Sequence, residues 1–150
     1  MAPDDRAVLK LRAEDTEDLA VVSACLQDAL VPVRDLAYVP EDRTFLFVAN
    51  RFRWENGLHP APGEIGYQRT LCGITFSEVA AVSYSGFRRS EDGRILSLLA
   101  IRPESGAVHL EFAAGATVRL RTAGIRCWLR DLGEPWPTRW YPAHEMDQPR

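Results

Sequence analysis

Apolar and polar residues alternate from Val108 to Arg121, and this period of two is the pattern of strands that are buried on one face only. Ala-Ala-Gly at 113–115 interrupts the pattern and suits a three-residue hairpin loop with the glycine in the left-handed conformation. The resulting register puts all apolar residues on one face: Val108, Leu110, Phe112, Ala116, Val118 and Leu120. We expect the opposite face to be comparatively exposed; it carries His109, Glu111, Thr117, Arg119 and Arg121.

Further short apolar stretches, separated by turn signals, predict strands along the rest of the chain. VPED at 39–42, SEDG at 90–93 and PESG at 103–106 are typical of tight turns. The predicted strands before the hairpin are 8–12, 33–39, 44–54, 70–76, 79–87 and 95–102, and the segments 70–76 and 79–87 alternatively form one long bent strand. Residues 55–69 contain two prolines and three glycines without a clear period, which indicates a long loop.

The segment after the first strand has the period of an α-helix. Asp15 or Thr16 can cap its N-terminus, and acidic residues in the first turn complement the helix dipole. Four apolar residues fall on one helical face: Leu19, Val22, Leu26 and Ala29. Pro32 ends the helical pattern.

A second helical pattern follows the hairpin, in TAGIRCWLRDLG, and predicts a closing amphipathic helix from Thr122 to Leu132. Its apolar stripe consists of Ile125, Trp128, Leu129 and Leu132. We expect Trp128 to be a principal core anchor, and Arg126 and Arg130 to face solvent.

These elements together predict an α+β fold with about seven mostly antiparallel strands, an N-terminal helix and a closing C-terminal helix. The order resembles that of pleckstrin-homology-like barrels, in which the last helix plugs one open end, and a twisted open sheet is the alternative. A fold analogy of this kind implies no function. The length predicts one domain over 1–150, with an ordered body at about 8–136 and a tail at 137–150.

Composition and charge narrow the classes of function. The net charge of −3 gives no overall attraction to nucleic acid or anionic membranes, and we expect neither as a partner. The three cysteines are widely spaced without a Cys/His cluster, so we expect no metal site and a reducing compartment. The charged N-terminus is unlike a signal peptide, and we expect a cytoplasmic protein without a cofactor.

The stretch TFLFVANRFRWE at 44–55 interleaves arginines with aromatic residues. On a strand, Arg51 and Arg53 share one face with Phe45 and Phe47, and Phe52 and Trp54 lie on the other face. Our interpretation is that the aromatic residues pack while the arginines lie at the rim of the sheet. Asn50, Arg51 and Arg53 are then candidates for binding an anionic group beside the 55–69 loop, because arginine suits bidentate anion binding.

Other polar and aromatic groupings give weaker indications. His109 and Glu111 resemble an acid–base pair, but on an exposed strand face they are typical of cross-strand polar pairs. AHEMD at 143–147 lacks the second histidine of a helical zinc site. Trp140 and Tyr141 either dock on the domain or contact a partner, and we retain both as candidate partner-binding residues.

Four segments together, DLAVVSACLQDAL, FVANRFRWE, ILSLLAIR and IRCWLRDLGEPW, resemble a family of small uncharacterised bacterial proteins classed only as a domain of unknown function. The likeness extends over roughly Leu9 to Trp136. It implies a bacterial source and a stand-alone domain, and it brings no catalytic residue or cofactor to this chain.

No catalytic constellation emerges from the motifs, since nucleotide-binding and hydrolase signatures are missing from the sequence. The sequence therefore favours a non-catalytic domain that binds a protein or peptide, or that self-associates as a homodimer. The alternative is an enzyme or small-ligand binder with a pocket between the 55–69 loop and Arg51 and Arg53. A pocket with buried ionisable groups favours the alternative, and an apolar surface patch favours the first hypothesis.

Overall fold

The computed structural model describes residues 9–53, 67–91, 93–133 and 136–138. In these ranges eleven strands form one antiparallel sheet, accompanied by the helix α1 (Thr16–Cys25). The strands are β1 (Lys10–Ala13), β2 (Leu30–Pro32), β3 (Ala37–Val39), β4 (Thr44–Phe52), β5 (Tyr67–Phe76), β6 (Val79–Ser85), β7 (Ile95–Glu104), β8 (Ala107–Phe112), β9 (Thr117–Thr122), β10 (Cys127–Asp131) and β11 (Trp136–Thr138).

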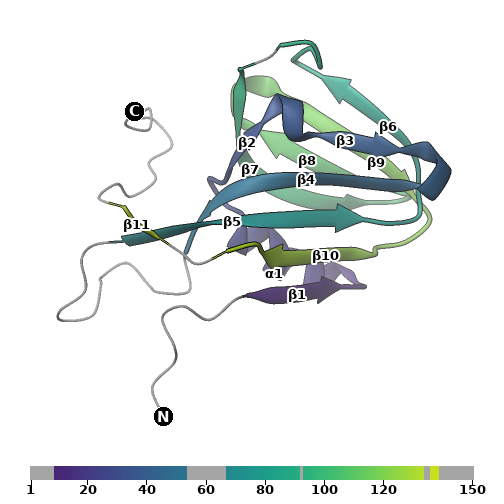
Figure 1. Ribbon diagram of the computed structural model, residues 1–150. Helices are drawn as coiled ribbons and strands as arrows, with labels where there is room; N and C mark the ends of the chain where they lie inside the picture. The colour runs from purple at the N-terminus through teal and green to yellow at the C-terminus, as the bar shows by residue number, and fades with distance from the viewer. Residues whose placement is uncertain (1–8, 54–66, 92, 134–135, 139–150) are drawn as a thin grey trace.

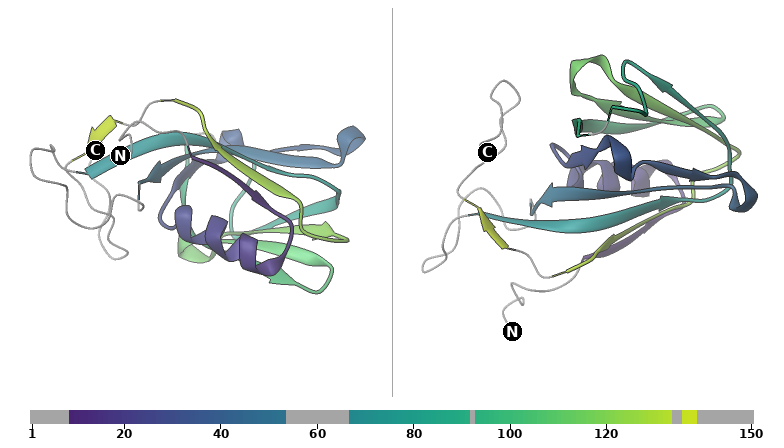
Figure 2. Two further views of the ribbon diagram at one scale, coloured as in Figure 1. Left: turned by 90° about the horizontal axis from the view of Figure 1, so that it is seen from below. Right: turned by 45° about the horizontal axis from the view of Figure 1, so that its top comes forward.

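The sheet bends over itself at β7, so that its two halves enclose the core (Figures 1 and 2). The order is β1-β10-β5-β4-β2-β7-β8-β9-β6, with β3 pairing with β4 and β11 with β5. The first residues of β7 pair with β2, and the register with β8 shifts between Leu98 and Ala100. Such a bulge bends a strand, which lets β7 belong to both halves.

The N-terminal helix forms where the sequence predicts it. Asp15 caps α1, because its Oδ1 accepts a hydrogen bond from the backbone N–H of Asp18 at 2.8 Å. The predicted apolar face is buried throughout: Leu19, Val22, Leu26 and Ala29. The helix ends at Cys25, earlier than Pro32, and the chain enters β2 through Asp28 at a positive φ of 63°. With ten residues, α1 is too short to cross a membrane, and the described residues contain no longer apolar helix.

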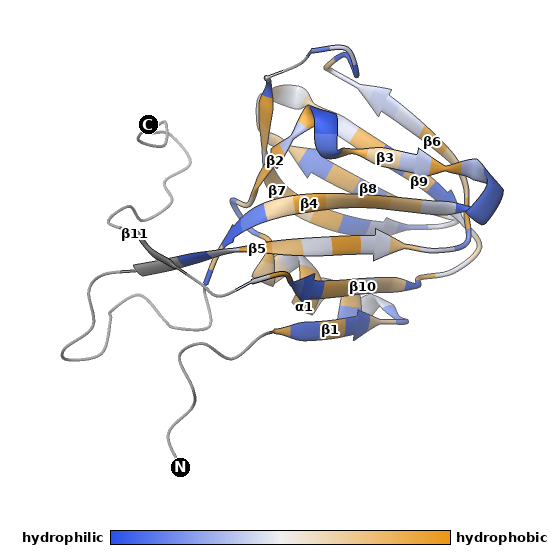
Figure 3. Ribbon diagram, viewed as in Figure 1, coloured by the Kyte–Doolittle hydropathy of each residue, from blue (hydrophilic) through white to orange (hydrophobic). Residues whose placement is uncertain are grey.

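One hydrophobic cluster fills the space between the two halves of the sheet and α1. Phe45 and Phe47 contribute from β4, and their ring centroids lie 6.0 Å apart. Leu98 and Leu110 contribute from the other half. The hydrophobic colouring along β4 in Figure 3 marks this core-lining strand.

The hairpin of β8 and β9 has the predicted register. Leu110 lies opposite Val118 and Val108 opposite Leu120, and the apolar face that the alternation predicts is buried. The turn contains Gly115 at φ 77°, as expected, and Ala114 at φ 63° as well. The period of two therefore identified both the strands and the buried face correctly.

The predicted closing helix is wrong, and with it the α+β, pleckstrin-homology-like fold of about seven strands. Residues Cys127–Asp131 form β10, which pairs with β1 on one side and with β5 on the other. Cys127, Leu129 and Asp131 point inward, whereas Trp128 is 37% exposed and is not a core anchor. The inward alternation includes the charged Asp131, so the hydrophobic pattern fitted a helix better than a strand.

Candidate functional site

Arg51 lies on the inner face of β4, contrary to the predicted rim position. It continues the inward series of Phe45, Phe47 and Ala49, and its side chain is fully buried. Phe52 and Arg53 are buried as well, at the end of the same strand. The arginine-aromatic stretch is therefore buried as far as the described part of the strand extends.

Asp131 of β10 holds the buried Arg51 through a bidentate ion pair. Nε and Nη2 of Arg51 each donate to one carboxylate oxygen of Asp131 at 2.9 Å. Oδ2 of Asp131 also accepts the backbone N–H of Leu9 at 3.0 Å. This charge-assisted geometry satisfies both buried groups and links β4 to β10 across β5.

The other predicted residue of this group, Asn50, binds an arginine that the sequence interpretation did not single out. Oδ1 of Asn50 accepts from Nε of Arg69 at 2.7 Å, and its backbone oxygen accepts from Nη2 of Arg69 at 3.1 Å. The Arg69 guanidinium lies 5.9 Å from the centre of the Phe52 ring. Burial lowers the pKa of Arg69, and the negative charge of Asp28 opposes that shift.

Arg51, Arg53 and Arg69 thus gather at the ends of β4 and β5. Arg51 and Arg69 are engaged by Asp131 and Asn50 in the folded chain. The predicted loop at 55–69 falls mostly outside the described residues, as do Trp140, Tyr141 and the AHEMD segment.

A groove of about 470 Å³ lies on the outer face of β1, β10 and β5. The strand register forms it: Arg12 lies opposite Trp128, which lies opposite Thr75, and Lys10 lies opposite Arg130, which lies opposite Gly73. We call this the outer groove, and its principal lining residues are Lys10, Arg12, Gly73, Thr75, Trp128, Arg130 and Leu132.

The floor of the outer groove is apolar. Gly73 carries no side chain there, and a Cβ at its position would lie 3.6 Å from Leu132. Leu132 and Trp128 are 54% and 37% exposed. Leu46 and Leu71, also exposed, lie on the same outer face of the sheet beyond the groove lining, so this face carries four of the seven exposed large hydrophobic residues of the described ranges.

The rim of the outer groove is basic. Arg12 forms an ion pair with Glu14, and both side chains are exposed. Lys10 and Arg130 have no ion-pair partner in the described part of the chain, and the residues found to line the groove include no carboxylate. A chain of net charge −3 therefore presents a local positive surface around an exposed tryptophan.

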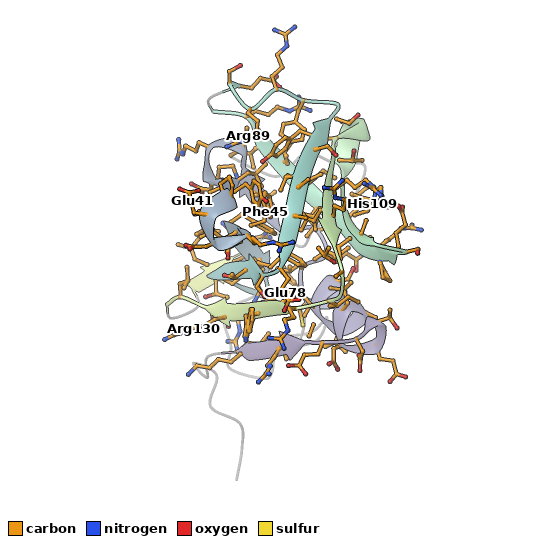
Figure 4. The ribbon with its side chains drawn as sticks, turned by 90° about the vertical axis from the view of Figure 1, so that its right-hand side faces the viewer. Glu41, Phe45, Glu78, Arg89, His109 and Arg130 are labelled. Carbon is orange, nitrogen blue, oxygen red and sulfur yellow. The ribbon has the colours of Figure 1, made fainter. Side chains whose placement is uncertain are left out.

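The predicted pair of His109 and Glu111 lies elsewhere, on β8, and Figure 4 shows His109 on the side of the molecule opposite Arg130. Nε2 of His109 lies 2.7 Å from Glu104, and Glu111 pairs with Arg102 at 2.9 Å. These are cross-strand surface contacts. Among the described residues, no group of three or more His, Cys, Asp or Glu side chains is arranged to hold a metal ion.

The outer groove was not predicted from the sequence, because the groove exists only if residues 127–131 form a strand and these residues were predicted to be helical. Lys10 and Arg12 alternate in KLRA, and Trp128 and Arg130 alternate in CWLRD. Interpreted as strands, both segments predict a face that combines cations with one aromatic residue. The pairing of these two segments could not be predicted from the sequence, because β1 and β10 come from opposite ends of the described chain.

The profile of a family described as "Protein of unknown function (DUF2948)" matches residues 9–144. The chain therefore belongs to this family, which confirms the resemblance to a domain of unknown function. No curated protein and no solved structure matches the chain.

Proposed function

We propose that this member of the DUF2948 family is a protein-binding module whose outer groove takes an acidic segment of another protein. The observation that carries the proposal is the position of Trp128, exposed among the cations Lys10, Arg12 and Arg130. Tryptophan and arginine are the residue types that contribute most to protein interfaces.

The apolar floor supports binding of a protein segment. Trp128 and Leu132, the exposed apolar side chains that line the groove, would lose contact with water under a bound partner, and burial of apolar surface is the main favourable term in protein association. Scattered apolar side chains are ordinary on protein surfaces, but a gathered patch next to a groove marks an interaction site.

The basic rim supports an acidic partner. Three cations surround the groove, and opposite charge on the partner would speed encounter and fix its orientation. The residues found to line the groove include no histidine, cysteine, aspartate or glutamate, which are the common acid–base and nucleophilic groups of enzymes. This lining favours binding over catalysis.

The experiment measures binding of a fluorescein-labelled (Glu-Leu)4 peptide by fluorescence anisotropy. We expect saturable binding that weakens with ionic strength, because the rim contacts are electrostatic. Trp128→Ala should weaken binding by roughly tenfold or more, as truncation of an interface tryptophan does. Lys10→Ala and Arg130→Ala should each weaken it less.

Two control variants match these changes in chemistry and exposure. Leu99→Ala removes an apolar side chain of β7 that is 39% exposed, close to the 37% of Trp128. Arg102→Ala removes an exposed cation of the same strand, away from the outer groove. Both should bind the peptide as the unmodified protein does. Equal losses in Trp128→Ala and Leu99→Ala would contradict the proposal.

Single-stranded nucleic acid is the competing class of ligand, because it too binds aromatic and basic side chains. The described residues that line the groove include one aromatic side chain and form an apolar floor, and the chain is acidic overall, so nucleic acid is the less favoured ligand. The proposal would be overturned if a labelled oligonucleotide bound more tightly than the peptide and Trp128→Ala weakened the binding of the oligonucleotide.

A small anionic ligand near the ends of β4 and β5 is the second candidate function. The observation that favours it is the burial of Arg51, Arg53 and Arg69 at one place. Phosphate or citrate should then raise the thermal unfolding temperature of the protein. Loss of this stabilisation in Arg53→Ala, but not in Arg130→Ala, would support the anion site. Equal stabilisation of both variants would reject it.

A further inference from the structure

We propose that the acidic segment binds as an added antiparallel strand on the outer edge of β1 and reaches the basic rim of the outer groove with its side chains, a proposal that rests on the proposed function. Among the strands of the described residues, β1 is the last of the sheet on this side and pairs with β10 alone. In Figure 1 no strand lies beyond it, and α1 packs behind it. An exposed strand edge is a template for pairing with another chain.

The register shows which backbone groups face that edge. The N–H of Asp131 donates to the backbone oxygen of Leu9 at 2.9 Å, so Leu9 and Asp131 form a hydrogen-bonded pair. In an antiparallel ladder such pairs alternate with pairs that do not exchange hydrogen bonds. Lys10 and Arg12 therefore direct their N–H and C=O groups away from β10, toward the free edge.

The same two residues present their side chains to the outer groove. Figure 3 shows this alternation along β1 as hydrophilic and hydrophobic colour. A residue placed opposite Lys10 or Arg12 in an added strand would project its side chain onto the groove face. Acidic residues two positions apart would thus meet both cations while their backbone completes the edge.

The charges also select the partner. If β1 paired with β1 of a second copy, the cations of Lys10 and Arg12 would face like charges, which destabilises a strand pair. A lysine or arginine on an edge strand guards against such self-pairing. The edge therefore favours an acidic segment of a different protein over a homodimer.

The opposite edge of the sheet, β6, is tied to neighbouring segments. Tyr38 donates its hydroxyl hydrogen to the backbone oxygen of Val79 at 2.8 Å, and the N–H of Val79 donates to the backbone oxygen of Arg43 at 2.8 Å. These contacts engage both backbone groups of Val79, at the start of that edge strand. Between the two ends of the strand order, β1 is the one whose outward groups accompany a groove.

The first test compares Lys10→Pro with Lys10→Ala in the anisotropy assay with the (Glu-Leu)4 probe. Both variants lose the charge, but only proline removes the outward N–H, and an edge strand tolerates proline at such a position. We expect Lys10→Pro to bind the probe about fivefold more weakly than Lys10→Ala does, because the proline variant lacks one backbone hydrogen bond to the probe. Equal affinities, with equal thermal stabilities, would overturn the edge pairing.

The second test leaves the protein unchanged and methylates backbone nitrogens of the probe. In the antiparallel arrangement the glutamates opposite Lys10 and Arg12 donate to β1, whereas the N–H groups of the leucines point away. N-methylation of the glutamates should weaken binding by about tenfold or more, and N-methylation of the leucines by much less. Equal effects, or the reverse order, would overturn the proposal.

These experiments test the outer groove as a binding site and the added strand separately. If the unmethylated probe binds with full dependence on Trp128 but both methylated probes bind equally, the groove is a binding site and the added strand is wrong. If the unmethylated probe does not bind, the proposed function itself is wrong.

Discussion

Arg51 and Asp131 form a bidentate ion pair inside the protein, with 0% and 3% of their side chains exposed. The two residues are 80 positions apart in the sequence, and their strands lie on either side of β5. The pair therefore fixes the relative position of three strands at one end of the core. It also explains how a strand that carries an aspartate can lie with that aspartate inward.

Removing one partner of this pair should be far more destructive than removing both. Arg51→Met leaves the Asp131 carboxylate buried with the N–H of Leu9 as its one remaining hydrogen-bond donor among the described residues, and we expect the free energy of unfolding to fall by about 3–5 kcal/mol. Arg51→Met combined with Asp131→Leu should recover much of that loss, because apolar side chains often replace a buried ion pair well. Urea denaturation of the single and double variants measures both effects.

The control is the exposed pair of Arg126 and Glu78, whose side chains are 50% and 53% exposed. Arg126→Ala should change the free energy of unfolding by less than about 1 kcal/mol, as exposed ion pairs do. A double variant at Arg51 and Asp131 that is no more stable than the single variant would argue against the pair as the cause.

Local patterns predicted the parts of the fold that depend on neighbouring residues. The alternation around Leu110 and Val118 and the cap at Asp15 are each contained within a few positions, and both were confirmed. The position of Asp131 was not predictable in this way. A charged residue is assigned to the surface by hydrophobic pattern alone, and only its distant partner Arg51 makes the inward position favourable.

The candidate site was predictable only in part. The sequence correctly placed Arg51 on the same face of the strand as Phe45 and Phe47, but it did not identify that face as the core side. The outer groove depends on contacts between β1 and β10, which are separated by more than a hundred residues. Such non-local pairing leaves no signal in the period of either segment.

The turn of the β8–β9 hairpin offers a test of backbone strain. Ala114 adopts a φ of 63°, which costs a residue with a Cβ about 1–2 kcal/mol. Ala114→Gly relieves that strain but makes the unfolded chain more flexible, so we expect a net stabilisation of up to about 1 kcal/mol. Gly115→Ala, at φ 77°, should destabilise the protein instead. Thermal unfolding of both variants in parallel decides whether the signs differ.

The thiol of Cys127 should resist modification in the folded protein. Burial raises its pKa to about 12, so it stays protonated where a free thiol ionises. Iodoacetamide at mildly alkaline pH should modify the half-buried Cys25 before Cys127, as mass spectrometry of digested peptides can show. Modification of Cys127 at the same rate as Cys25 would contradict the buried position of β10.

The raised pKa of Cys127 also makes the free energy of unfolding depend on pH. The thiol is protonated in the folded state and ionises in the unfolded state above its ordinary value of 9.0. Its contribution to stability is therefore fully present below pH 9 and is lost progressively as the pH rises toward 12. Cys127→Ala should flatten this alkaline decline, which denaturation at a series of pH values measures.

Trp128 and Leu129 are adjacent in β10 and point to opposite faces, which gives a direct test of the strand against the helix that the sequence favoured. On the helical stripe both residues would be buried together, and both alanine variants would be destabilised. On the strand, Leu129→Ala should cost about 2–5 kcal/mol because Leu129 is buried. Trp128→Ala should cost no more than about 1 kcal/mol because its side chain lies partly in solvent on the outer face.

The same two variants separate stability from binding. Trp128→Ala should remain folded and lose affinity for the acidic peptide, since its side chain belongs to the outer groove. Leu129→Ala, assayed below its unfolding transition, should retain most of that affinity because its side chain faces the core. Chemical denaturation gives the stabilities and fluorescence anisotropy gives the affinities. If Leu129→Ala bound the peptide more weakly than Trp128→Ala did, the assignment of Trp128 to a binding surface would fail.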